Sequence, residues 1–248
     1  FFFFKQKTAY EMLRSLVGSE RCIRGRPYMA IADTITMQWV SGYYASPGGE
    51  FTVVINNNNL DPDLNWVLLY YDSKTKGIGG YSNSFQTFCV EYSEHIYIGR
   101  TYNFSISDKA ILGGVSSGGD PISIGTAWLY YQFATGALNN YNYNSGRSTS
   151  AGYLQEIIWY LEEERTSIST NNPFDDMLIS QFGSLANAMK DNSGSYPVAV
   201  LNLYNLNGTN AQDQLVLVPE PSTLLLMGAG LVGIGVFGRK RFRRKERI

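Results

Sequence analysis

The chain has 248 residues, 44% of them hydrophobic, and its 20 lysines and arginines nearly balance 21 aspartates and glutamates. The balance is uneven, because residues 33–218 hold seven basic and seventeen acidic residues, a net charge of −10. Nucleic acids are bound mainly through basic patches, so this segment argues against a nucleic-acid partner. It is long enough for one domain with a sizeable core.

Residues 1–26 do not have the pattern of a folding unit. Two blocks within them, KQKTAYE and LVGSERCIRGR, resemble translated sequencing adapters, so we interpret residues 1–26 as an adapter-derived artefact. Residues 27–32 are then the remnant of a signal peptide. Ala30 and Ala32 provide the small residues that signal peptidase requires, and the mature ectodomain is expected to span residues 33–218.

The first half of the ectodomain predicts β-strands. In the first strand, alternation puts Ile35, Met37 and Trp39 on one face. Runs of glycine and asparagine separate the successive segments, as is typical of turns. The expected strands are residues 33–40, 50–55, 65–71, 85–92 and 102–106.

The second half predicts three helices followed by two strands. The expected helices are residues 122–136, residues 151–164, and residues 172–190 with Asn172 as the cap and Pro173 in the first turn. The middle helix has apolar residues at helical spacing: Leu154, Ile157, Ile158 and Leu161. Strands follow at residues 197–204 and 214–218. The fold class is therefore α+β, a mostly antiparallel β module with about three inserted helices.

A C-terminal single transmembrane helix is expected after the ectodomain. Residues 223–238 form sixteen uncharged residues, close to the lower limit of about 17 for a span. Arg239, Lys240 and Arg241 flank this run and can extend it to the membrane interface. Seven of the last ten residues are basic, which favours a cytoplasmic C-terminus. The alternative is a buried core helix, but its many glycines disfavour a soluble helix.

The order of elements in residues 219–248 carries a family resemblance. Pro219, Glu220 and Pro221 precede the apolar run and the basic cluster, and this resembles the PEP-CTERM sorting signal, an anchor of the ice-binding-protein C-terminal type. The resemblance implies export from a Gram-negative cell, anchoring in the inner membrane, and recognition by an exosortase. The protein would then reach the cell surface or the extracellular matrix.

Two motifs in the ectodomain resemble the bacterial thioester (TQXA-like) adhesin domains. They are Phe88-Cys89-Val90-Glu91 and Leu154-Gln155-Glu156-Ile157-Ile158-Trp159, although Leu154 stands where that family usually has threonine. The resemblance implies that the sulfur of Cys89 bonds to the side-chain carbonyl of Gln155 with loss of ammonia. The alternative is that Cys89 is a small buried hydrophobic residue and Gln155 a solvated helix residue.

The functional expectation is a non-enzymatic surface protein. The thioester would attach it covalently to surface amines or exopolysaccharide. A non-covalent exopolysaccharide-binding module, with Tyr141 and Tyr143 as sugar platforms, is the second possibility. A hydrolase is disfavoured, because no catalytic base or carboxylate pair is recognisable. The sequence suggests no cofactor and no metal site, and His95 alone is a weak candidate ligand.

Overall fold

The computed structural model describes residues 34–56, 64–111 and 119–218. The predicted adapter-derived segment, signal-peptide remnant, sorting motif and transmembrane helix lie outside these residues. Within them, no helix combines the length and the apolar character needed to cross a membrane.

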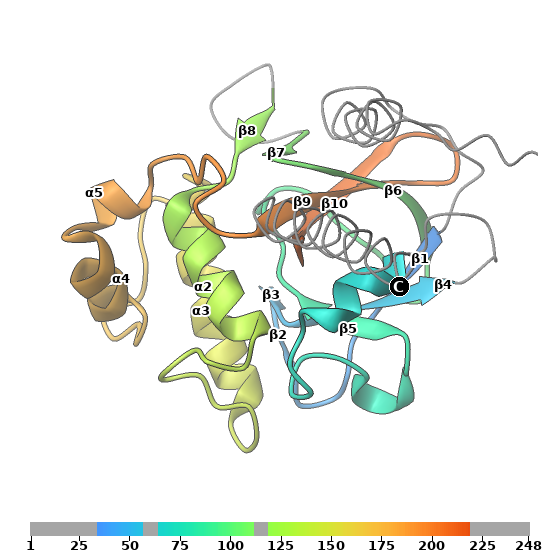
Figure 1. Ribbon diagram of the computed structural model, residues 1–248, viewed down its shortest axis with the longest axis horizontal. Helices are drawn as coiled ribbons and strands as arrows, with labels where there is room; N and C mark the ends of the chain where they lie inside the picture. The colour runs from blue at the N-terminus through green and yellow to red at the C-terminus, as the bar shows by residue number, and fades with distance from the viewer. Residues whose placement is uncertain (1–33, 57–63, 112–118, 219–248) are drawn as a thin grey trace, which may run out of the picture.

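The main element is an antiparallel sheet of six strands in the order β10-β9-β6-β1-β4-β5 (Figure 1). Strand β1 lies inside it and pairs with both β4 and β6. Strand β6 in turn pairs with β9, so the strands before and after the helices form one sheet. The strands are β1 (Thr34–Gln38), β4 (Phe51–Asn56), β5 (Ser84–Thr87), β6 (Thr101–Ser107), β9 (Val198–Tyr204) and β10 (Asn210–Leu217).

The two edges of the sheet meet just beyond β5. The amide of Leu215 donates to the carbonyl of Phe88 at 3.1 Å, and the amide of Val90 donates to the carbonyl of Asp213 at 3.0 Å. Cys89 lies between these bonds, opposite Gln214. The predicted strand 85–92 therefore has two parts: β5 pairs with β4, and the following residues pair with β10.

Shorter elements connect the strands. They are the hairpin β2 (Tyr44–Ala45) and β3 (Gly48–Gly49), the pair β7 (Lys109–Ala110) and β8 (Asp120–Pro121), and the 3-10 helices η1 (Leu64–Leu69) and η2 (Ile78–Gly80). The prediction of a strand at residues 65–71 was wrong, since η1 occupies that segment. The buried residues Leu64, Val67 and Tyr71 are three and four positions apart, which is a helical rather than an alternating period.

Four α-helices lie in the described part of the chain: α2 (Ile124–Ala134), α3 (Arg147–Leu161), α4 (Asp175–Phe182) and α5 (Leu185–Ala188). Helices α2 and α3 lie beside the sheet, and α4 and α5 lie outside them (Figure 1). The third predicted helix was wrong as a single element. Gly183 has a φ of 82°, which ends α4 before α5 begins. Asn172 does not cap α4; its side chain accepts from the amide of Phe174 in the preceding turn.

The apolar stripe predicted for the middle helix is confirmed. Leu154, Ile157, Ile158 and Leu161 of α3 are all at most 1% exposed. The start of the same helix is fixed by a buried ion pair, in which Nε of Arg147 donates to Oε2 of Glu50 at 2.8 Å. Glu50 lies between β3 and β4, so this pair joins α3 to the hairpin and the sheet.

Candidate functional site

Cys89 is buried where the two edges of the sheet meet. In an antiparallel pair, successive residues direct their backbone groups to opposite sides. Phe88 and Val90 bond to β10, so the amide and carbonyl of Cys89 face away from that strand. Buried backbone groups need partners, and none of the strands in the described residues supplies them on this side.

Gln155 of α3 supplies both partners. The amide of Cys89 donates to Oε1 of Gln155 at 3.0 Å, and Nε2 of Gln155 donates to the carbonyl of Cys89 at 2.8 Å. The carboxamide thus pairs with Cys89 as a neighbouring strand would. Gln155 is 1% exposed, so the alternative of a solvated helix residue is wrong. The two residues singled out from the motifs lie in direct contact, although they are 66 positions apart in the sequence.

Two further glutamines contact the sulfur of Cys89, and the sequence analysis missed both. The thiol donates to Oε1 of Gln212 at 3.0 Å, and Nε2 of Gln214 lies 3.5 Å from the sulfur. Both belong to β10, where the pairing with β9 shifts between Ala211 and Gln214. Bulges of this kind redirect side chains near functional sites. Neither residue belongs to the quoted motifs, so only the tertiary structure reveals them.

A group of carboxyl residues lies on the other side of this bulge. Oδ1 of Asp213 accepts from the amide of Leu203, and Oε2 of Glu91 accepts from the amide of Asp213, both at 3.1 Å. Burial raises the pKa of Glu91 well above its usual range, and the carboxyl groups of Asp213 and Glu94 raise it further. Both effects favour the protonated form of Glu91.

The thiol itself is weakly acidic. Burial raises the pKa of Cys89 to about 12, and the neighbouring Glu91 also raises it, although a hydrogen bond from Gln214 opposes them. A thiolate is the reactive form of cysteine, so this residue is not a freely reactive surface thiol. Its chemistry is confined to groups that the fold brings into contact with it.

The β2–β3 hairpin covers the site from outside. A Cβ atom on Gly48 would lie 2.4 Å from the ring of Trp159 and 2.8 Å from Cγ of Gln155. Only glycine permits such a close approach, so the backbone of β3 lies directly on these two side chains. Trp159 is 3% exposed, and with the hairpin it separates Gln155 from solvent.

A pocket of about 790 Å³ opens beside the covered site. Gln212 and Trp159 line it, so one wall is a residue that contacts the sulfur of Cys89. Aromatic residues form much of the remaining lining, together with the segment 92–98. Trp39 is among them and is 47% exposed. The sequence placed Trp39 on the same strand face as Ile35 and Met37, but β1 ends at Gln38 and the ring of Trp39 packs on Tyr44, with centroids 5.9 Å apart.

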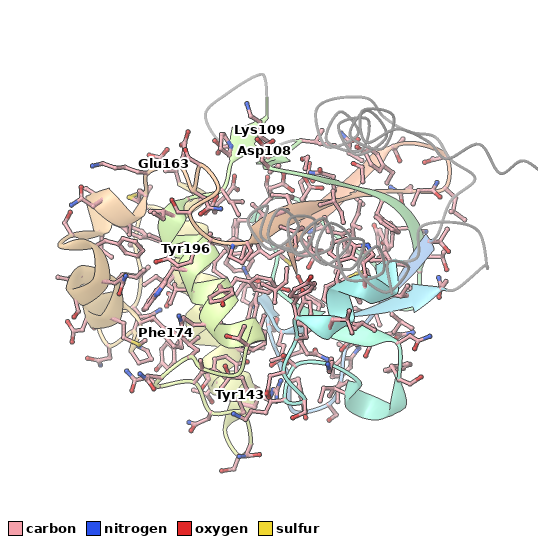
Figure 2. All side chains as sticks on the ribbon, in the orientation of Figure 1. Asp108, Lys109, Tyr143, Glu163, Phe174 and Tyr196 are labelled. Atoms are coloured by element: carbon pink, nitrogen blue, oxygen red, sulfur yellow. The ribbon has the colours of Figure 1, made fainter. Side chains whose placement is uncertain are left out.

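The tyrosines predicted as sugar platforms lie elsewhere. Tyr141 is 6% exposed and its hydroxyl donates to Oε2 of Glu50 at 2.6 Å. Tyr143 is half-buried below the helices (Figure 2), and its hydroxyl donates to the carbonyl of Phe133 at 2.9 Å. Both therefore serve the packing around α2 and α3. His95 lines the pocket, and no group of metal-binding side chains is found in the described ranges.

Comparison with protein families gives a match at the end of the chain. Residues 217–244 match the PEP-CTERM protein-sorting motif, a stretch that includes Pro219, Glu220 and Pro221 as well as the basic residues 239–241. The chain carries a PEP-CTERM sorting motif. This motif marks an exported protein that is anchored and then processed by an exosortase. Comparison with curated proteins and with solved structures gives no significant match.

Proposed function

We propose that this PEP-CTERM protein forms an internal thioester between Cys89 and Gln155 and uses it once to attach covalently to a surface amine or hydroxyl. The observation that carries the proposal is the pair of hydrogen bonds between the Gln155 carboxamide and the backbone of Cys89. They hold the electrophilic carbon of one residue beside the residue that bears the nucleophile. The protein is then a single-use tether and not an enzyme.

Thioester formation needs no external reagent. The sulfur of Cys89 attacks the side-chain carbon of Gln155, and the amide of Cys89 already donates to the oxygen on which negative charge develops. The C–N bond then breaks, and the thiol proton completes the departing ammonia.

The surroundings of the pair suit a bond that water would otherwise destroy. Cys89 and Gln155 are each 1% exposed, and Trp159 and the β2–β3 hairpin lie over them. Exclusion of water is the usual means by which proteins protect reactive intermediates from hydrolysis. A nucleophile would reach the thioester from the pocket, past Gln212.

The test is intact-mass analysis of the purified chain. The expected mass is lower than the sequence mass by one ammonia, and Cys89 should resist alkylation in the native protein and after unfolding. Methylamine should add to the protein and release a thiol. Peptide mapping should locate the methylamide at Gln155 and not at Gln212 or Gln214.

Two variants control this test. Cys89→Ser and Gln155→Met should both keep the full sequence mass and should not react with methylamine. Gln181→Met, on the exposed face of α4, should still lose ammonia. An unmodified wild-type mass with a freely alkylated Cys89 would show that the bonds from Gln155 only satisfy the buried backbone.

A non-covalent polysaccharide-binding module is the second candidate function. The exposed aromatic residues of the pocket favour it, rather than Tyr141 and Tyr143, which pack around α2 and α3. In that case the protein should be retained on polysaccharide resin, be released by excess free sugar, and keep its full sequence mass.

A further inference from the structure

The pocket beside Cys89 gathers aromatic side chains that remain exposed. Trp39 is 47% exposed, Tyr92 45% and Tyr97 61%, and the other aromatic residues of the lining are Tyr44, Phe51 and Trp159. Large aromatic rings gathered at one exposed pocket mark a binding site more often than a chance feature of the surface. Flat rings of this kind stack on the C–H faces of pyranose rings.

Polar groups lie among these rings. Ser93, Glu94, His95 and Gln212 line the same pocket and provide donors and acceptors for hydroxyl groups. A volume of about 790 Å³ lies within the range of sites for whole small molecules, which is roughly 300–1,000 Å³. The mixed aromatic and polar lining therefore suits a sugar ring.

The charge of the lining selects among sugars. Glu94 is the carboxyl group among the lining residues, and no lysine or arginine of the described chain belongs to that lining. Arg100 and Arg165 stack on Tyr97 and Tyr92, at 4.7 and 5.7 Å from the ring centroids. These two cations border the rings but do not line the pocket, so a sugar inside it meets Glu94. An anionic sugar would be repelled there, whereas a sugar with an amine would gain an acceptor and a favourable charge.

We infer that this pocket presents an amino sugar, a pyranose ring with a free primary amine, to the thioester of Cys89 and Gln155. The inference rests on the proposed function, because the thioester is the group that the amine attacks. Gln212 connects the two places, since it lines the pocket and accepts the hydrogen bond from the Cys89 thiol.

The capture step is balanced without a further reagent. The amine nitrogen bonds to the side-chain carbon of Gln155, the C–S bond breaks, and the sulfur takes up the proton that the amine loses. The products are an amide and the free Cys89 thiol. Only a neutral amine is nucleophilic, and a ring amine flanked by hydroxyls is less basic than lysine, whose pKa is about 10.4. A larger share of the amino sugar is therefore reactive at neutral pH.

The experiment compares acceptors on the full chain by intact mass. The acceptors are a β-1,4-linked glucosamine oligomer, its fully N-acetylated form, a lysine peptide and methylamine. The glucosamine oligomer should form an adduct at Gln155 with a saturating rate, about tenfold faster than the lysine peptide at equal concentration, a difference worth about 1.4 kcal/mol. The N-acetylated oligomer should form no adduct. Equal, non-saturating rates for oligomer and peptide would overturn the inference.

Pocket variants sharpen the comparison. Tyr97→Ala should lower the rate with the glucosamine oligomer about tenfold relative to the rate with methylamine, because an aromatic platform is lost. Tyr70→Ala removes a tyrosine that is 37% exposed outside the pocket, and it should leave that ratio unchanged. An unchanged ratio in Tyr97→Ala would count against the pocket.

The Cys89→Ala variant separates this inference from the proposed function. It cannot form a thioester, yet calorimetry should still detect binding of the glucosamine oligomer. If this variant binds no oligomer although the wild-type chain has lost ammonia, the result supports the thioester and contradicts the amino-sugar site. If the wild-type chain has its full sequence mass, no thioester has formed and covalent capture is contradicted. Binding of the oligomer by the variant would then still support the sugar site.

Discussion

At the scale of single residues, three glutamines contact Cys89. The carboxamide of Gln155 bonds to its backbone amide and carbonyl. The other two are Gln212 and Gln214, which lie in β10. They contact the sulfur because of a bulge in β10, and a one-residue shift in strand pairing has no sequence signal of its own.

Glu162 is the residue for which we predict a clear pH dependence. It is 5% exposed, and its Oε1 accepts from the amide and the hydroxyl of Ser123, the cap of α2. Burial raises its pKa from 4.5 to about 7, against the hydrogen bonds that favour the charged form. The folded protein therefore binds this proton more tightly than the unfolded chain, so stability is full below pH 4.5 and falls as the pH rises towards 7.

Glu162→Gln should remove this dependence, because an amide oxygen can still accept from Ser123 without ionising. The free energy of unfolding at pH 8 should rise relative to wild type, by at most about 3 kcal/mol. Urea unfolding at pH 5 and pH 8 measures it. The neighbouring exposed Glu163→Gln is the control, and a wild-type slope that survives in Glu162→Gln would contradict the assignment.

At the scale of elements, the sequence predicted most strands and two helices. The α3 stripe was correct because a period of 3.6 residues with four aliphatic side chains leaves one face to bury. The predictions for residues 65–71 and 172–190 were wrong. The buried residues of the first segment follow a helical spacing, and Gly183 ends α4 inside the second.

At this scale, we predict the effect of a substitution in the β2–β3 hairpin. Gly48→Ala should force apart the hairpin and the pair Trp159–Gln155, because the added Cβ would lie well inside van der Waals contact. Overpacking of this kind costs about 1–3 kcal/mol of unfolding free energy. The opened cover should also speed hydrolysis of the thioester, seen as the gain of one water and the conversion of the Gln155 carboxamide to a carboxyl group.

Ser46→Ala is the matched control, because Ser46 is exposed in the same hairpin. Its unfolding free energy should stay within about 0.5 kcal/mol of wild type. If Gly48→Ala unfolds at the same denaturant concentration as Ser46→Ala, the hairpin does not bear on the site.

At the scale of the whole molecule, the contact between residues 88–90 and 213–215 holds the domain together. It joins segments about 125 residues apart and closes the sheet around the core. Native-state hydrogen exchange should therefore find that the amides of Val90 and Leu215 exchange only through global unfolding. The amide of Tyr43, in an exposed turn, should exchange much earlier. Early exchange at Val90 would show that the two edges separate locally.

The sequence by itself determined the sorting route of this protein and the identity of its two candidate reactive residues. The sorting motif is linear, since Pro219-Glu220-Pro221, the apolar run and the basic cluster act in order along the chain, and its match at residues 217–244 confirms it. The tertiary structure alone decided the surroundings: the three glutamines around one sulfur, the glycine that admits the cover, and the pocket. These depend on contacts between distant segments, and the pairing of distant segments is set by the packing of the whole core rather than by any local pattern.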